Sequence, residues 1–117
     1  MSLRNWKVQV RKGLLELVVL NRLKNSDYYG YDLVQELKSI DGLSMREGTV
    51  YPILARLEEE GFVEHVIKES STGPPRKYFR ITREGRKAVV EMNAHWETME
   101  QAVGAAKGLK KEARDEQ

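Results

Sequence analysis

The chain has 117 residues, of which 40% are hydrophobic and 32% are charged, and this suits one domain with a single modest core. It contains no cysteine, which excludes disulfides, thiolate zinc sites and cysteine nucleophiles and suits the reducing cytoplasm. No run of about 18 apolar residues occurs and no signal peptide is evident, so we expect no membrane association.

The charges are unevenly distributed, although the formal net charge is only +2. Two segments, residues 1–24 and 70–87, each contain six Lys or Arg residues and one Glu, whereas the segment between them is acidic. A concentrated basic segment favours nucleic acid as a partner, and a solvated surface is the alternative explanation.

Helices are predicted in the first part of the chain. Apolar residues at helical spacing predict a helix over residues 6–24. A polar turn at 25–27 provides a cap region for a second helix over residues 28–40, which Asp41 and Gly42 end.

A third helix is predicted to begin at Ser44. The segment from Ser44 to Glu47 matches the capping box, in which each side chain accepts from the other residue's amide. Pro52 cannot donate to the carbonyl of Gly48, so we expect one helix with a local kink rather than a break. The acidic end before Gly61 is expected to point away from any DNA, and Arg56 to pair with a nearby acid.

The pattern then changes from helical spacing to short β-branched and aromatic runs. Residues 62–69 and 76–82 predict two strands of a hairpin, separated by a tip at residues 70–75. Thr82 is expected to cap a final helix. The predicted fold is therefore mainly α with a small β-hairpin, a winged helix-turn-helix followed by a C-terminal dimerisation helix.

Three segments, at residues 29–37, 47–63 and 73–89, resemble the PadR family of transcriptional regulators, and its compact subgroup that includes multidrug-sensing repressors. The resemblance implies a sequence-specific, ligand-responsive repressor that binds an inverted-repeat operator in double-stranded DNA as a homodimer. The alternative is a winged-helix module for protein–protein interaction without specific DNA binding. We divide the chain into a DNA-binding domain at 1–82, a dimerisation helix at 83–108 and a polar tail at 109–117.

Two groups of residues are candidates for DNA contact. The positive end of the third helix suits a phosphate or a base edge, and a stiff tip flanked by cations suits a phosphate or a minor groove. The alternative for each residue is a structural role without DNA contact. Ser44 would then only cap the helix, Tyr51 would fill an edge of the core, and the wing cations would prevent an exposed strand from pairing with other chains. The candidates are Ser44, Arg46, Thr49 and Tyr51 on the helix and Gly73, Arg76 and Lys77 on the wing.

An apolar stripe with heptad spacing runs along the last helix. Such a stripe predicts a dimer seam or core packing. The resemblance implies that Trp96 also lines a pore that stacks a small planar aromatic effector, with first-helix residues as the opposite wall. The candidates for a ligand site or dimer interface are Val89, Met92, Trp96, Met99 and Val103, together with Trp6, Val10 and Leu14.

Catalysis finds no support in the sequence. His65 and His95 lie far apart, and neither belongs to a pair with metal-ligand spacing. No Gly-rich phosphate loop and no nucleophile motif occurs. We therefore expect no enzyme activity, no cofactor and no metal.

Overall fold

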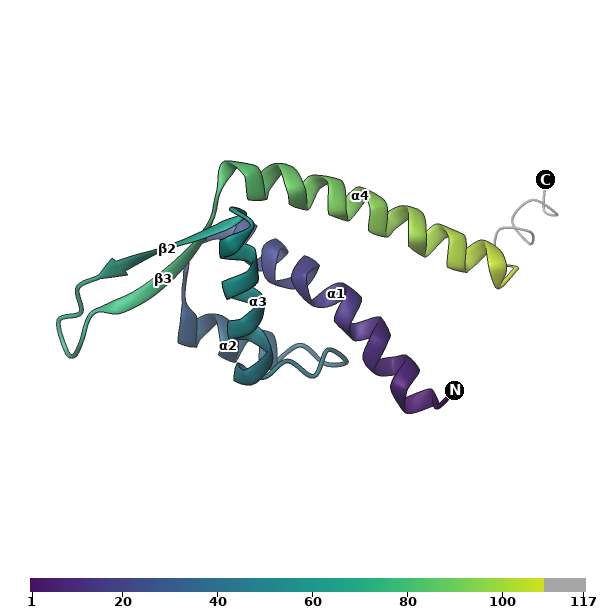
Figure 1. Cartoon of the computed structure of the whole chain (residues 1–117), viewed down its shortest axis with the longest axis horizontal. Helices are drawn as coiled ribbons and strands as arrows, with labels where there is room; N and C mark the ends of the chain where they lie inside the picture. The colour runs from purple at the N-terminus through teal and green to yellow at the C-terminus, as the bar shows by residue number, and fades with distance from the viewer. Residues whose placement is uncertain (109–117) are drawn as a thin grey trace.

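The computed structural model describes residues 1–108, which form an elongated molecule of 62 × 33 × 23 Å. The described residues form four helices and one small antiparallel sheet, so the predicted fold class is confirmed. In Figure 1 the hairpin of β2 and β3 projects away from the helices. The elements in chain order are α1 (Leu3–Asn25), β1 (Tyr28–Tyr29), α2 (Gly30–Lys38), α3 (Glu47–Glu59), β2 (Val63–Lys68), β3 (Arg76–Ile81) and α4 (Arg83–Ala106).

The sheet has three strands in the order β1-β3-β2, one more than the sequence predicts. The predicted hairpin pairs from Val63 opposite Ile81 to Lys68 opposite Arg76. The additional strand β1 pairs Tyr29 with Tyr78 across the other edge of β3. A strand of two residues is too short for a period in the sequence, and it exists only because β3 supplies its hydrogen-bond partners.

The start of α2 therefore differs from the prediction. This helix begins at Gly30 rather than at residue 28, and its N-cap is Tyr29 with no capping hydrogen bond from a side chain. The cap region that we expected at residues 25–27 is wrong, because Asn25 is the last residue of α1 and only Ser26 and Asp27 lie between α1 and β1.

The predicted capping box before α3 is also wrong. The helix begins at Glu47, and Arg46 is its N-cap, without a capping side chain. Ser44 has a φ of 53°, in the left-handed region, and precedes the helix. From Glu47 onward the predicted single helix is confirmed, since α3 runs without a break through Pro52, and its kink stays a prediction.

The hydrophobic core lies where α1, α2, α3, the sheet and the start of α4 converge. Phe79 and Ile81 of β3 both face it, as the alternation in the sequence predicts. The side chains that are most completely enclosed are Val19, Leu20, Leu23, Leu33, Val34, Leu37, Val50, Leu54, Leu57, Val63 and Val89.

Two residues fix the point at which α4 leaves the sheet. The hydroxyl of Thr82 accepts a hydrogen bond from the Gly85 amide at 3.0 Å and donates one to the Gly61 carbonyl at 2.6 Å, which confirms the predicted cap. A Cβ atom on Gly85 would lie 2.1 Å from the carbonyl oxygen of Phe62. Only glycine therefore allows this close approach.

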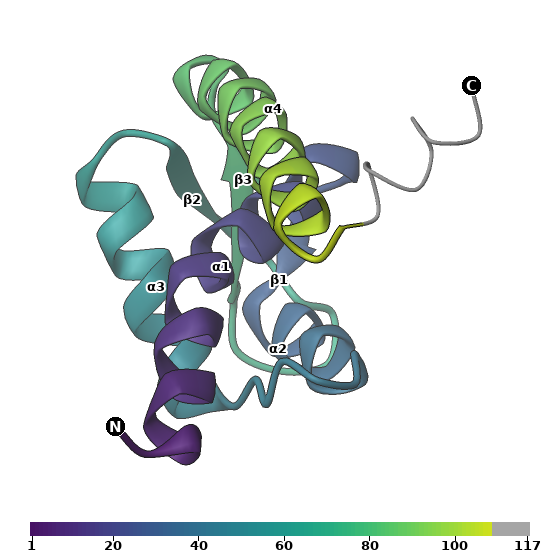
Figure 2. The same ribbon diagram turned by 90° about the vertical axis from the view of Figure 1, so that its right-hand side faces the viewer.

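The hairpin and the free ends of the two long helices lie at opposite ends of the molecule (Figure 1). Figure 2 looks along α4 from the helical end, with α1 beside it. Asn21 of α1 and Asn93 of α4 exchange side-chain hydrogen bonds of 2.9 and 2.8 Å. Within the described part of the chain, no helix is both long and apolar enough to span a bilayer, and the predicted polar tail at 109–117 lies outside the described residues.

Candidate nucleic-acid interface and effector cavity

The N-terminal end of α3 exposes residues that can reach DNA. The side chain of Arg46 is exposed, and that of Thr49 is half-buried one turn along. The amides of Thr49 and Val50 both donate to the Arg46 carbonyl at 2.9 Å, which leaves the amides before them without helical acceptors. These free donors and the helix dipole favour a phosphate at this end of α3.

Tyr51 serves the core and the surface together. A Cβ atom on Gly30 would lie 3.3 Å from the ring and the hydroxyl oxygen of Tyr51, so this ring packs on the first residue of α2. The Tyr51 side chain nevertheless stays 42% exposed. Its pKa is raised, first by partial burial and then by the electrostatic influence of Glu47 and Tyr29.

The wing presents cations above aromatic rings. Gly73, Arg76 and Lys77 are all exposed. The Cζ atom of Arg76 lies 4.7 Å from the centroid of the Tyr29 ring, and the Nζ atom of Lys77 lies 5.3 Å from that of Phe79. These distances are within the range of cation–π attraction.

Sequence analysis missed a third wing cation, Lys68. Its Nζ atom lies 4.5 Å from the centroid of the Tyr78 ring, and Lys68 pairs directly with Arg76 across the hairpin. The predicted bounds, 62–69 and 76–82, place Glu69 rather than Lys68 opposite Arg76, so the prediction pointed one residue away from this cation. The wing surface therefore comprises Lys68, Arg76 and Lys77.

Other arginines are engaged with carboxylates and are less free to bind phosphate. Arg56 pairs with Glu16 at 2.9 Å, which confirms that it pairs with an acid. Arg80 pairs with Asp27 at 3.3 Å, and Arg22 pairs with Glu36. Within residues 1–108, no ion pair involves Arg46 or Arg76.

The acidic end of α3 is largely exposed, with Glu59 and Glu60 on the surface and Glu58 half-buried. Glu58 contacts His65 of β2, with 2.5 Å between Oε2 and Nδ1. No group of three or more residues with metal-binding side chains occurs among residues 1–108.

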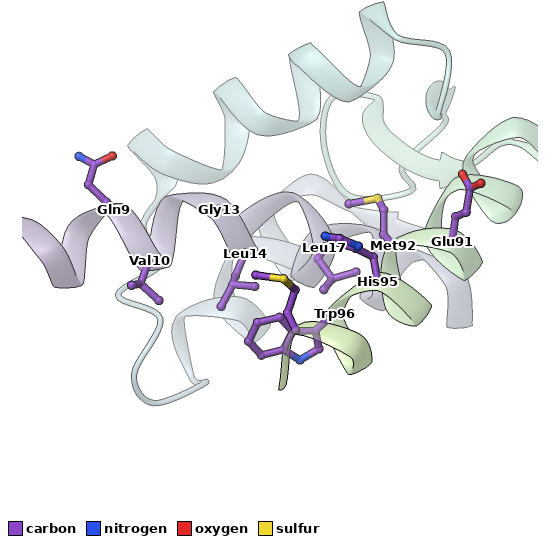
Figure 3. Close-up of a pocket in the computed structure, with 10 residues that line it drawn as sticks. Gln9, Val10, Gly13, Leu14, Leu17, Glu91, Met92, His95 and Trp96 are labelled. Atoms are coloured by element: carbon purple, nitrogen blue, oxygen red, sulfur yellow. The ribbon is translucent and has the colours of Figure 1, made fainter. Parts of the chain in front are cut away.

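A cavity of about 730 Å³ lies between α1 and α4. Figure 3 shows the lining side chains of the two helices. Leu14 and Leu17 come from α1, and Met92, His95 and Trp96 come from α4. Its lining is mainly apolar, which suits a flat hydrophobic ligand. The lining residues are Gln9, Val10, Gly13, Leu14, Leu17, Glu91, Met92, His95, Trp96 and Met99.

The structure brings together five of the eight residues proposed for this region, namely Val10, Leu14, Met92, Trp96 and Met99. The proposed role of Val89 in a ligand site or dimer interface is corrected. Its side chain is fully buried in the core of the single chain and is therefore not available to a second copy. Trp6 and Val103 are exposed beyond the cavity and do not line it.

Half of the residues that line the cavity were not predicted from the sequence. Gly13 and Leu17 continue the spacing of Val10 and Leu14 along α1, so the period could have indicated them. Glu91 and His95 are polar neighbours on α4, and an apolar stripe gives no signal for residues at its edge.

Comparisons with known proteins agree with this architecture. The Transcriptional regulator PadR-like family matches residues 19–91, more than half of the chain. The transcriptional regulator Rv3488 of Mycobacterium tuberculosis is 32% identical over 85 residues, which cover 71% of this chain and 76% of that protein.

Solved structures show the same likeness. A PadR-like transcription factor from Bacteroides fragilis is 36% identical with a TM-score of 0.72, over 87% of this chain and 98% of that chain. A PadR family transcriptional regulator from Eggerthella lenta is 32% identical with a TM-score of 0.77, over 88% and 89%. This chain therefore belongs to the PadR-like family of transcriptional regulators and is a DNA-binding regulator, not an enzyme.

Proposed function

We propose that the protein is a ligand-responsive repressor that binds an inverted-repeat operator as a homodimer. The N-terminal end of α3 enters the major groove, where Arg46 and Thr49 reach base edges or phosphates and Ser44 and Tyr51 lie beside them. The wing, with Gly73 at its tip, contacts the flanking backbone through Arg76 and Lys77. Dimer symmetry then requires half-sites about 10 base pairs apart, or a multiple of this spacing.

A second copy of the chain covers the apolar surface of α1 and α4 in this proposal. Trp6, Val10, Met99 and Val103 are between 41 and 54% exposed in the single chain. An apolar patch formed by such exposed side chains would be typical of an interface. The exposed stripe has the heptad spacing of a helix–helix seam, which favours another helix as the occupant.

The main observation in favour of ligand response is the position of the cavity. It opens between the same two helices that form the proposed dimer interface, and the Trp96 indole beside it is 36% exposed. A small planar aromatic effector that stacks on Trp96 changes how α4 lies against α1. Because α4 begins at the sheet, this change alters the separation of the two α3 helices and thus the affinity for DNA.

DNA binding is tested by measuring the affinity for DNA around the protein's own gene at several salt concentrations. In Arg76→Ala plus Lys77→Ala, we expect weaker binding and a dependence of log K on log salt that is shallower by about two units. The matched control, Arg4→Ala plus Lys7→Ala, removes the same charge at the opposite end of the molecule and should retain the wild-type slope.

Equal slopes for the wing variant and the wild type would contradict the wing assignment. Failure of the wild type to select any inverted repeat over random DNA would favour the alternative, a protein–protein interaction module. Both outcomes are readable from one titration series.

The effector is tested by fluorescence in a Trp6→Phe background, which leaves Trp96 as the emitter. We expect planar aromatic compounds to quench this emission and to change the affinity for operator DNA. If no compound of a broad panel quenches, Trp96 serves packing alone.

A further inference from the structure

The side chain of Tyr29 lies between the two elements that are proposed to contact DNA. Tyr29 belongs to β1 and pairs with Tyr78 of β3. Arg76 precedes Tyr78 by two residues on the same strand, so Arg76 and Tyr78 share one face of the sheet. On that face the Arg76 guanidinium lies over the Tyr29 ring, with Cζ 4.7 Å from its centroid.

The rings beneath Arg76 and Lys68 contact each other. The centroids of Tyr29 and Tyr78 are 5.7 Å apart, and those of Tyr29 and Tyr31 are 6.2 Å apart. Lys68 lies over Tyr78 at 4.5 Å. Two wing cations thus rest on two tyrosines that pack together, and Tyr29 connects this group to the first residue of α2.

A ring holds a guanidinium without using any of its hydrogen-bond donors. The attraction is between the cation and the ring quadrupole, so the N–H groups of Arg76 remain free for phosphate oxygens. The ion pairs of Arg22, Arg56 and Arg80 occupy donors with carboxylates instead. Within residues 1–108, no hydrogen bond or ion pair engages the Arg76 guanidinium.

The ring also limits the freedom of a long side chain. Arginine has many rotamers, and ordering them only when DNA arrives would cost conformational entropy. A side chain that already lies over a ring has lost part of this freedom before binding. The benefit therefore appears as tighter DNA binding rather than as a more stable fold.

We propose that Tyr29 is a positioning residue for DNA binding, whose ring holds the Arg76 guanidinium in place for the phosphate backbone. The inference rests on the proposed contact of the wing with DNA. Tyr29 precedes Gly30, on which Tyr51 of α3 packs, so the same short segment supports the wing and adjoins the DNA-reading helix.

A double-mutant cycle measures the link between the two residues. Tyr29→Leu should weaken DNA binding by about two- to fivefold, the value of an exposed cation–π contact. Arg76→Ala should weaken it further and reduce the salt slope by about one unit. In the Arg76→Ala background, Tyr29→Leu should have no additional effect, whereas a general structural role would weaken binding in both backgrounds.

Variants that preserve the ring provide the control for folding. Tyr29→Phe keeps the ring and should bind as the wild type does, because no hydrogen bond of the Tyr29 hydroxyl occurs within residues 1–108. Phenylalanines with increasing fluorination at position 29 keep the shape of the ring while they reverse its quadrupole. We expect the affinity for DNA to fall stepwise along this series.

Equal affinity across the fluorinated series, or additive effects in the cycle, would overturn the role of Tyr29. If Arg76→Ala itself leaves both affinity and salt slope unchanged, the wing contact of the proposed function is wrong instead. The fluorinated series decides the question even if Tyr29→Leu does not fold.

Discussion

The two halves of α4 carry similar apolar residues but end in different surroundings. In the first half, Val89 is fully buried against the core, whereas Trp96, Met99 and Val103 in the second half are 36 to 54% exposed. The reciprocal amide pair of Asn21 and Asn93 lies at the border between these halves. The apolar stripe of α4 is thus buried in the core of its own chain in the first half of the helix and exposed on the surface in the second half.

The same transition occurs along α1 in the opposite direction. Leu20 and Leu23 are enclosed near its C-terminal end, but Trp6 and Val10 are 51 and 41% exposed near its start. The first residues of α1 and the last residues of α4 lie at the same end of the molecule (Figure 1), and both helices have exposed apolar residues there. Stripe spacing alone does not distinguish a core from an interface, and burial in the single chain does.

The largest expected effect is loss of the proposed dimer. In Met99→Asp plus Val103→Asp, two unpaired carboxylates would have to be buried between the copies, so the dimer dissociation constant should rise by at least about a thousandfold. Analytical ultracentrifugation measures this dissociation constant. Val90→Asp is the matched control, because Val90 is exposed on another side of α4 and should leave the dimer intact. A dimer that survives the double substitution would place the interface elsewhere.

The second-largest expected effect concerns Gly85, at the start of the buried half of α4. Gly85→Ala brings a methyl group against the Phe62 carbonyl, and we expect the free energy of unfolding to fall by about 3 kcal/mol. Chemical denaturation measures this fall. Gly48→Ala is the control, because a Cβ there meets no atom within 4 Å, and it should be neutral or slightly stabilising. Equal stabilities of the two variants would show that α4 can shift at little cost.

One substitution made in both halves locates the border between them. Val89→Ala should lower the free energy of unfolding by about 2 kcal/mol, because it removes buried methyl groups and leaves a void. Val103→Ala should change the stability of the single chain by less than about 0.5 kcal/mol and should weaken the dimer instead. Both are measured at one protein concentration, since association contributes to apparent stability. Equal losses would mean that the stripe is buried throughout.

The smallest effect belongs to the cap. Thr82→Ala removes the hydroxyl that accepts from the Gly85 amide, and we expect a loss of about 1 kcal/mol in the free energy of unfolding. Thr82→Ser keeps the hydroxyl and should restore most of this loss. If serine fails to restore it, the methyl group of Thr82 rather than its hydroxyl stabilises the start of α4.

Much of the fold could be predicted from the sequence because its signals are local. Helical spacing and strand alternation placed the three helices of the first half, the hairpin and α4 in the right order. The cap at Thr82 and the inward-facing Phe79 and Ile81 followed from single-residue chemistry. The wing cations Arg76 and Lys77 were found for the same reason, since charge beside a stiff tip is visible in the residues themselves.

The errors arise where distant segments compete with a local motif. The capping-box pattern at Ser44 and Glu47 was present, but α3 begins three residues later than Ser44, and Met45 is buried in the core instead. Burial of Met45 and the left-handed backbone of Ser44 accompany this later start. A local pattern worth about 1 kcal/mol does not decide a boundary against the burial of a large side chain.

The sequence by itself determined the order and type of the main elements, the charge of the wing and the existence of an apolar stripe, because each is carried by neighbours along the chain. Only the tertiary structure decided that Tyr28 and Tyr29 form a strand, that Val89 belongs to the core, and that Arg76 lies over Tyr29. These three facts depend on segments far apart in sequence. Their free energies come from contacts that exist only after the chain has folded.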